Sequence, residues 1–334
     1  MCGEASDDII VGEARIIGEF LAPLTDGDAG AFGLIDDCAV VTPRTGEELV
    51  VTTDSLIEGV HFLAGDVPAF KALAVNVSDL VAKGARPIAY LLTLALPSAP
   101  TRGLMTRIAG ELRAAQTLFG CRLIGGDTDR TPGPLTLTIA AIGSVPAGGA
   151  VRRKGARAGD AIVVTGTIGD ACLGLRLRKD AELGRAAGLD ADQIGWLVGR
   201  FDRPVPPMGA VGLVREFASA AMDVSDGLAK DLARLCLASE VGAKVEIERV
   251  PVSAPARRVT ESGRVNLVDL VAGGEDYEVL MTVAQERLPE LMLRAHGSGV
   301  VVSEIGVVSD GCDVQWRDRN GDLLRFQRTG FEHF

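Results

Sequence analysis

The chain has 334 residues, of which 47% are hydrophobic and 24% are charged, and its formal net charge is -11. This length predicts two domains, each large enough to bury a core of its own. Sequence-independent binding to nucleic acid relies on Lys and Arg that neutralise phosphates, so the acidic balance argues against a nucleic-acid partner. Anionic substrates stay possible, because bound divalent cations reverse the local field.

The six cysteines are scattered and form no C-x-x-C pair, which favours reduced thiols in a cytosolic protein over disulfides or a zinc site. The N-terminus lacks a signal-peptide pattern, and the longest apolar stretch, 88–96, is too short to span a bilayer. We therefore predict a cytoplasmic protein without membrane contact.

Apolar residues recur at helical spacing over 8–24, which predicts a helix. Asp36 and Asp37 then precede a short apolar strand over 38–41. Adjacent strand residues face opposite ways, so only one of these carboxylates can readily join a shared site. A solvated turn is the alternative interpretation.

The segment that follows carries hard oxygen atoms. The apolar run 49–51 predicts the end of a buried strand, and Thr52, Thr53 and Asp54 come directly after it. Two hydroxyls and a carboxylate at a strand end suit a magnesium ion and a polyphosphate. His61, one of three histidines, follows seven residues after Asp54. We interpret this segment as half of a metal–nucleotide site.

A helix is predicted over 70–82, with Asn76 and Asp79 on one face. Because this helix is mostly apolar, Asp79 is either buried and paired or metal-bound, or it is the single carboxylate that faces solvent. Further on, the predicted strand 121–124 ends in Gly125, Gly126 and Asp127. Glycines there allow a phosphate to approach the backbone.

The segment 146–149 is the best candidate for a domain boundary, giving domains 1–146 and 147–334. Arg153 lies just beyond it in the only dense basic cluster, 152–157, which is either a solvated loop or a phosphate contact. A predicted strand, 160–165, then leads through glycines to a predicted helix, 171–177. This junction lacks the Walker A pattern but could hold phosphate at the helix N-terminus.

Three further acidic or aromatic motifs follow. Asp223 and Ser225 point the same way if a strand ends there, and Ser225 or Asp226 either caps the next helix or joins the site. Glu275 lies among three acids beside two glycines, before an apolar strand. The C-terminal tail, which contains Phe331, either frays or docks. Phosphoryl transfer needs mainly positioning and charge neutralisation, so these motifs predict a magnesium-dependent nucleotide enzyme without a covalent catalytic nucleophile.

In this order, the motifs resemble those of the thiamine-monophosphate kinases. The matching segments are 36–40, 53–62, 74–80, 125–128, 159–166, 222–228, 273–278 and 330–334. The resemblance implies a two-domain α/β fold of the aminoimidazole-ribonucleotide-synthetase-like superfamily, with N-terminal domains that pair in a homodimer. It also implies direct in-line transfer from ATP to thiamine monophosphate, the last step of thiamine diphosphate biosynthesis.

The resemblance further implies roles for individual residues. His61, Glu275 and Phe331 would line the thiamine monophosphate pocket, and the ATP contacts would be Gly126, Asp127, Arg153 and Ser225. Several Mg²⁺ ions would be held by Asp37, Thr52, Thr53, Asp54, Asp79, Asp127, Asp223 and Asp226. The family usually has Gly where this chain has Ile35, which leaves open whether Asp36 or Asp37 is the ligand; the motif favours Asp37.

Two other functions compete with this one. Enzymes of the same superfamily use ATP to activate an oxygen or selenium atom, and they carry a glycine-rich or Cys-bearing N-terminal segment that the surroundings of Cys2 do not resemble. An acidic nucleotide-binding protein without turnover would not need His61, Glu275 and Phe331.

Overall fold

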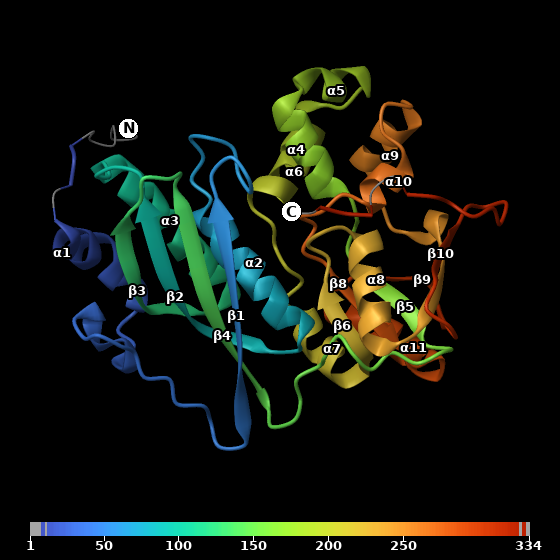
Figure 1. Ribbon diagram of the computed structural model, residues 1–334, viewed down its shortest axis with the longest axis horizontal. Coiled ribbons are helices and arrows are strands. Elements are labelled where there is room, and N and C mark those ends of the chain that lie inside the picture. Colours follow the sequence, from blue (N-terminus) through green and yellow to red (C-terminus); the bar gives the residue numbers. More distant parts are fainter. Residues whose placement is uncertain (1–7, 11, 327–328, 332–334) are drawn as a thin grey trace. The chain divides into compact units, whose positions relative to one another are not determined.

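The computed structural model describes residues 8–10, 12–326 and 329–331. The chain divides into two compact units (Figure 1). The first unit comprises Met1–Leu80 and Ala85–Gly148, and the second comprises Val81–Gly84 and Gly149–Phe334.

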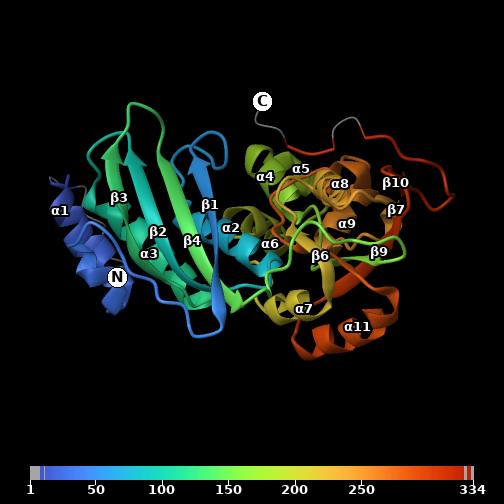
Figure 2. The ribbon, with the colours of Figure 1, turned by 60° about the horizontal axis from the view of Figure 1, so that its bottom comes forward.

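The first unit is built on a four-stranded sheet with the order β1-β4-β2-β3 (Figure 2). Strand β4 pairs antiparallel with β1 and with β2, whereas β2 and β3 are parallel. The strands are β1 (Glu47–Ile57), β2 (Arg86–Leu96), β3 (Arg122–Arg130) and β4 (Thr136–Pro146).

Strands β1 and β3 extend beyond the polar residues at which the sequence predicts that they end. In β1, Thr52 pairs with Ala141 and Asp54 pairs with Ile139, so both lie inside the strand. In β3, Asp127 pairs with Thr93 of β2. Hydrogen bonds to neighbouring strands therefore keep these polar segments extended, and the prediction that they follow a strand end is wrong.

Helices α2 (Ala69–Ala82) and α3 (Arg102–Phe119) cover one face of this sheet (Figure 1). The predicted bounds of α2 are confirmed to within one residue. Helix α3 begins after Thr101, whose hydroxyl accepts the Leu104 N–H, and ends at Gly120 with φ of 69°. These are the usual start and stop residues of a helix.

The N-terminal segment differs from the single predicted helix over 8–24. It contains α1 (Glu13–Ile16), a π-helix (Ile17–Leu21) and a 3-10 helix (Ala22–Thr25). A proline lies in the first turn of the 3-10 helix, where its missing N–H removes an α-helical hydrogen bond. A second 3-10 segment spans Ala29–Leu34. The strand predicted over 38–41 is also wrong, since this segment is irregular.

The second unit is built on a six-stranded sheet with the order β10-β7-β9-β5-β8-β6. Only β10 and β7 pair in parallel among these described strands. The strands are β5 (Ala161–Thr165), β6 (Ala218–Asp223), β7 (Gly242–Glu246), β8 (Val279–Val283), β9 (Val302–Ser309) and β10 (Val314–Arg317).

Two apolar cores hold this unit together. The larger core packs α8 against the sheet, with Leu232 and Leu280 fully buried in it. The smaller core joins α4, α6, α9 and α10 through residues such as Leu197 and Leu270. The helices are α4 (Asp170–Lys179), α5 (Ala181–Ala186), α6 (Ala191–Asp202), α7 (Ala210–Phe217), α8 (Leu228–Ser239), α9 (Ala254–Glu261), α10 (Leu267–Val271) and α11 (Leu288–Gly297), with short 3-10 turns at Ile247–Arg249 and Gln285–Arg287.

Within the described ranges, no helix combines the length and the apolar character needed to cross a bilayer. The five cysteines that the structure describes are all free, and two of them, Cys38 and Cys312, are exposed. Cys2, His333 and Phe334 lie outside the described residues.

Candidate functional site

In the first unit, the predicted metal-binding segment of β1 is connected to helix α2. The Thr52 hydroxyl donates a 2.5 Å hydrogen bond to the Asp79 carboxylate. The Asp54 N–H donates to the side-chain oxygen of Asn76 at 3.0 Å. Side chains two positions apart on a strand share a face, so Thr52 and Asp54 both lie on the side of α2. The structure therefore brings Thr52, Asp54 and Asp79 together.

Thr53, the third oxygen-bearing residue of this segment, faces the other way. Its hydroxyl donates to the carbonyl oxygen of Ile139 at 3.0 Å. The strand alternation thus separates its side chain from those of Thr52 and Asp54. The three residues do not form one continuous ligand set through their side chains.

His61 lies in the turn after β1, where contacts hold both its ring and its backbone. Its Nδ1 accepts the Ile57 N–H at 3.1 Å, so the neutral ring carries its proton on Nε2. The buried Lys71 ammonium donates to the His61 carbonyl at 3.1 Å. The orientation of the imidazole is therefore fixed before any substrate binds.

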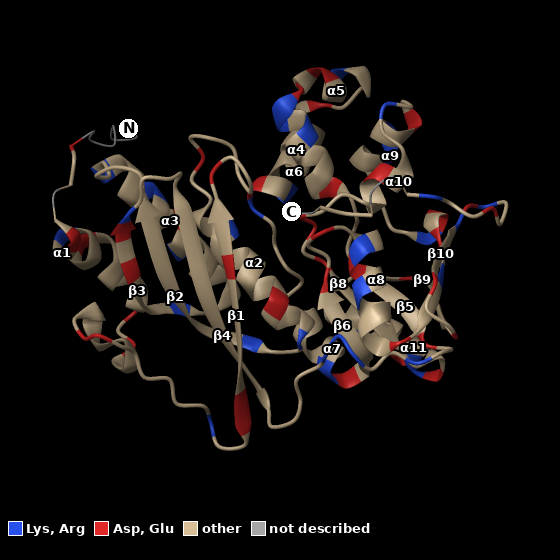
Figure 3. Cartoon of the chain, in the orientation of Figure 1, with Lys and Arg blue, Asp and Glu red and all other residues tan. Residues whose placement is uncertain are grey.

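A cavity of about 420 Å³ lies in the same unit and contains the other predicted acidic motifs. Asp36, Asp37 and Asp127 line it together with Glu13, and no Lys or Arg is among its described lining residues. Acidic residues also mark β1 and β3 in Figure 3. Four carboxylates with no Lys or Arg among the lining residues that the structure describes form a surface that favours a positively charged ion.

Gly126 also lines this cavity, and its position requires glycine. Its φ is 149°, and a Cβ atom there would lie 1.8 Å from the carbonyl oxygen of Leu92. The two acidic motifs next to it make local hydrogen bonds: the Asp36 carboxylate accepts the Asp37 N–H at 2.8 Å, and Asp127 accepts the Thr128 N–H at 2.8 Å. Both Asp36 and Asp37 line the cavity, so the choice between them as a ligand stays a prediction.

In the second unit, hydrogen bonds connect the segment of Asp223, Ser225 and Asp226 to the segment of Glu275. Asp223 ends β6, as predicted. The Glu275 N–H donates to the Ser225 carbonyl at 2.8 Å, and the Tyr277 N–H donates to the Val224 carbonyl at 2.8 Å. The residues expected to bind ATP and metal are thus adjacent to a residue expected to bind the acceptor.

The C-terminal tail docks at the same place. The Phe331 N–H donates to the Asp226 carbonyl at 3.0 Å, and the Lys230 ammonium donates to the Phe331 carbonyl. The Phe331 side chain stays 45% exposed. The tail therefore presents an aromatic ring beside Asp226, and for Phe331 the docking prediction is confirmed.

Neither Ser225 nor Asp226 caps helix α8. The N-cap is Gly227, which makes no side-chain hydrogen bond. The Asp226 carboxylate instead pairs with Arg234 at 2.6 Å and with Lys230 at 3.3 Å. The capping hypothesis is wrong, because the N-cap position belongs to Gly227 and no side chain that the structure describes makes a capping hydrogen bond to α8.

Asp231 is a residue that the sequence analysis did not single out. One of its carboxylate oxygens accepts the N–H groups of Ser225 and Asp226, at 3.0 and 2.9 Å. Burial raises the pKa of this carboxyl to about 6. Asp231 lies three residues after Leu228 and four before Leu235, so its position on the apolar face of α8 was the available signal.

The backbone of Arg153 contacts the C-terminal end of α8. Its carbonyl accepts the Ser239 hydroxyl at 3.2 Å, at the C-terminal end of α8. The neighbouring Arg152 carbonyl accepts the Ala221 N–H of β6 at 2.9 Å, so the backbone at Arg153 lies between β6 and the C-terminal end of α8. The exposed side chain of Arg153 stays a predicted ATP contact.

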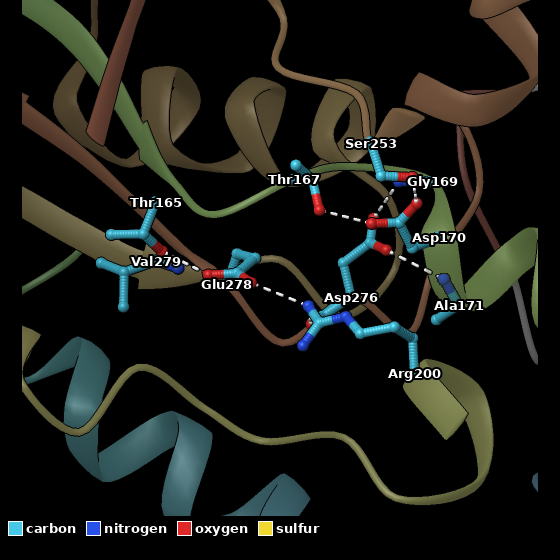
Figure 4. Close-up of polar contacts among 10 residues, drawn as sticks. All are labelled: Thr165, Thr167, Gly169, Asp170, Ala171, Arg200, Ser253, Asp276, Glu278 and Val279. Carbon is cyan, nitrogen blue, oxygen red and sulfur yellow. Dashed lines mark hydrogen bonds and ion pairs between the residues drawn. The ribbon is translucent and has the colours of Figure 1, made fainter. Parts of the chain in front are cut away.

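The strand–glycine–helix junction before α4 does not have an open N-terminus. The Asp276 carboxylate accepts the N–H of Gly169 at 2.7 Å and that of Ala171 at 3.3 Å (Figure 4). An internal carboxylate thus occupies the place where the sequence suggested a phosphate. Burial raises the pKa of Asp276 well above its usual range, and these N–H groups oppose that shift.

In the part of the chain that the structure describes, no three His, Cys, Asp or Glu side chains are grouped in a way that could hold a metal ion. The predicted ligands instead form smaller sets, around Asp54, around the cavity of Asp37 and around Asp223. Magnesium keeps several waters and is often held by one or two carboxylates plus substrate phosphates. These sets fit that mode of binding, and the metal roles stay predictions.

Comparison with known proteins agrees with the fold. The family model of the AIR synthase related protein N-terminal domain matches residues 35–145, and that of the C-terminal domain matches residues 157–318. A thiamine-monophosphate kinase from Caulobacter vibrioides is 38% identical over 326 residues, which cover 95% of this chain and 89% of the relative.

Two solved structures also match most of this chain. Thiamine-monophosphate kinase from Stenotrophomonas maltophilia K279a matches with a TM-score of 0.76 and 34% identity, covering 95% of this chain and 93% of that chain. AaThiL complexed with AMPPCP and TMP matches with a TM-score of 0.76 and 30% identity, and the match covers 91% of this chain and 97% of that chain. The two-domain α/β fold implied by the resemblance is confirmed. The chain belongs to the thiamine-monophosphate kinase family.

Proposed function

We propose that the protein transfers the γ-phosphoryl group of ATP to thiamine monophosphate, giving ADP and thiamine diphosphate. The observation that carries this proposal is the hydrogen-bonded arrangement of Ser225, Asp226, Glu275 and Phe331 in one unit. It sets a predicted nucleotide segment beside a predicted acceptor segment. A relative that is 30% identical has been solved with AMPPCP and TMP, which supports the same pair of ligands here.

The acceptor residues suit the chemistry of thiamine monophosphate, which carries a cationic thiazolium ring and an anionic phosphate. The carboxylate of Glu275 complements the positive ring, and the face of Phe331 attracts a cation. His61, with its proton on Nε2, offers a donor for a phosphate oxygen. On the nucleotide side, the backbone at Gly126 and the cation of Arg153 suit phosphate groups.

Several Mg²⁺ ions belong to this proposal, with Asp37, Thr52, Thr53, Asp54, Asp79, Asp127, Asp223 and Asp226 as their ligands. The carboxylates of the cavity and of the β1–α2 set are hard oxygen donors and fit magnesium. Asp226 fits less directly, because Lys230 and Arg234 already neutralise it. When bound, the ions neutralise phosphate charge and orient the nucleotide.

Transfer is proposed to be direct and in line, with no phosphoenzyme. The attacking atom is a phosphate oxygen of thiamine monophosphate, which is already anionic near neutral pH. The protein then needs to align two ligands and neutralise their charges, and no nucleophilic side chain is required. The carboxylates, glycines and histidine that are predicted to bind the two ligands fit that requirement.

A homodimer through the first unit is also proposed. Helices cover one face of the four-stranded sheet, and on its other face Val51 is 64% exposed and Leu91 is 37% exposed. The segment 31–41 covers this face only in part, and the apolar side chains that it leaves exposed favour burial against a partner. We also propose a cytoplasmic location, because the free exposed thiols of Cys38 and Cys312 suit a reducing compartment.

The test is to incubate the purified protein with ATP, Mg²⁺ and thiamine monophosphate and to separate the products by chromatography. Free thiamine serves as the control acceptor. Thiamine diphosphate from the monophosphate alone supports the proposal. Release of ADP without thiamine diphosphate would instead favour a sibling activity of the superfamily, and ATP binding without ADP release would favour a protein without turnover.

A further inference from the structure

The loop that carries Glu275 has an unusual backbone. Glu275 has φ of 79° and Tyr277 has φ of 53°, and neither is glycine. Side chains with a Cβ rarely adopt this left-handed region, so the surrounding contacts must hold them there. Asp276, between them, is buried, with 1% of its surface exposed. The contacts of Asp276 and its neighbours therefore decide where Glu275 points.

Asp276 is held from two directions. Its carboxylate accepts the N–H groups of Gly169 and Ala171 at the beginning of α4. Its carbonyl oxygen accepts a hydrogen bond from the Arg200 guanidinium of α6 at 3.3 Å. Side chain and backbone of this one residue are thus attached to two different helices (Figure 4).

The same guanidinium nitrogen also reaches Glu278, where the loop joins β8. Arg200 donates to Glu278 Oε1 at 2.7 Å. The other carboxylate oxygen of Glu278 accepts the Thr165 hydroxyl at 2.7 Å, and Thr165 in turn accepts the Val279 N–H at 2.8 Å. Arg200 therefore bridges both ends of the 276–278 segment.

The ion pair between Arg200 and Glu278 is tightly packed. A Cβ at Gly166 would lie 2.2 Å from Glu278 Oε1, so the carboxylate packs against bare backbone. The side chain of Glu278 is 7% exposed and that of Arg200 is 16% exposed. Removing one partner of such a pair leaves the other charge buried and uncompensated.

We propose that Arg200, Asp276 and Glu278 are positioning residues that hold Glu275 in the orientation required by the phosphoryl acceptor. The inference rests on the proposed function, and none of the three residues belongs to the proposed ligand contacts. Their effect reaches the acceptor through Glu275, the half-buried residue that precedes the segment they hold.

The first test compares two variants of helix α6 in the full-length protein. Arg200→Lys keeps a positive charge, but the lysine side chain is shorter by one bond, so its ammonium falls short of the carbonyl and the carboxylate that one guanidinium nitrogen contacts together. Asp202→Asn is the matched control, because Asp202 lies on the same helix and pairs with Arg178 of α4 at 2.7 Å instead of with the loop. Michaelis constants for both substrates and melting temperatures are measured for each.

Arg200→Lys is expected to raise the Michaelis constant for thiamine monophosphate about tenfold and that for ATP less than about threefold, since small misplacements of a contact residue are costly. Asp202→Asn is expected to leave both constants unchanged. Equal effects on the two substrates, or equal kinetics in the two variants, would overturn the inference. A purely structural role would lower the melting temperature without this split.

A double variant tests whether the network acts through Glu275. In a Glu275→Gln background, Arg200→Lys is expected to add less than about a twofold change, because coupled residues are not additive. Full additivity would contradict the inference. If Arg200→Lys does not fold, Glu278→Gln replaces it, since the amide keeps an acceptor for Thr165 and loses the charge that Arg200 neutralises.

Failure of the proposed function is distinguishable from failure of this inference. A wild-type protein that makes no thiamine diphosphate contradicts both. A wild-type protein that makes it, with an Arg200→Lys variant indistinguishable from Asp202→Asn, contradicts the positioning role alone.

Discussion

The backbone N–H of Phe331 donates a 3.0 Å hydrogen bond to the carbonyl oxygen of Asp226. The C-terminal tail is thereby attached to the turn that leads into α8. Because Glu275 is bonded to Ser225 in the same turn, the two expected acceptor residues are fixed to consecutive backbone carbonyls. This relationship connects the tail directly to the segment that is predicted to bind the acceptor.

Replacing Phe331 with alanine tests that connection. We expect Phe331→Ala to raise the Michaelis constant for thiamine monophosphate about tenfold, because an aromatic contact with a cation is lost, while the backbone bond to Asp226 stays. Phe331→Tyr, which keeps the ring, is the control. Steady-state kinetics with each substrate varied in turn provide the measurement, and an unchanged constant for the acceptor would contradict the role of the ring.

A substitution of Asp54 tests the proposed metal sites. We expect Asp54→Asn to lower turnover by at least about a hundredfold, because it removes a carboxylate from the set formed with Thr52 and Asp79. Glu48→Gln changes another acid of the same strand and should leave turnover intact. The rate of thiamine diphosphate formation is measured at saturating Mg²⁺. Near-normal turnover in Asp54→Asn would exclude Asp54 from the metal site.

A substitution of Arg153 tests whether the basic cluster 152–157 contacts ATP. We expect Arg153→Ala to raise the Michaelis constant for ATP about tenfold and to change that for thiamine monophosphate much less, since a charged hydrogen bond to phosphate is lost. Lys154→Ala is the control, because its ammonium pairs with Glu240 at 3.3 Å. Equal constants for ATP in Arg153→Ala and the wild type would make the cluster a solvated loop.

The raised pKa of Asp231 leads us to expect a specific dependence of stability on pH. Burial raises its pKa from 3.8 to about 6. Between these values the folded protein holds a proton that the unfolded chain has released, so the free energy of unfolding falls as pH rises. The carboxyl is fully buried, and the loss across this window is roughly 3 kcal/mol.

Urea unfolding of the wild type and of Asp231→Asn, measured from pH 4 to pH 7, checks this dependence. The variant cannot titrate at this position, so the wild type should be most stable relative to the variant near pH 4 and should lose that advantage by pH 7. A stability difference that stays constant over this range would show that Asp231 does not carry the effect.

Local patterns predict some of the regular elements well, namely the most apolar ones. The spacing of apolar residues gives α2 to within one residue, and a run of apolar residues gives β5 to within one residue. These segments have a burial pattern that follows directly from their own residues. The fold class follows from the family motifs, and the matches to known proteins confirm it.

The sequence does not reveal which residues that are distant along the chain pair with one another. Strand β1 continues through Thr52, Thr53 and Asp54 because β4 pairs with it along its whole length. The N-terminus of α4 is closed by Asp276, which is 107 residues from Gly169. Periodicity reports which residues are buried, but it does not identify the distant group that satisfies a buried donor.

The short segment Val81–Gly84 belongs to the second unit although both of its neighbours belong to the first. The Lys83 ammonium donates to the Ala221 carbonyl at 2.7 Å, and the Val151 N–H donates to the Lys83 carbonyl at 3.1 Å. The polypeptide therefore passes between the units three times. A protease that cuts the 146–149 connection leaves a nicked protein whose N-terminal fragment still contains part of the other unit. If the two halves were expressed separately and divided at this point, the C-terminal half would lack Val81–Gly84 and would not contain an intact second unit.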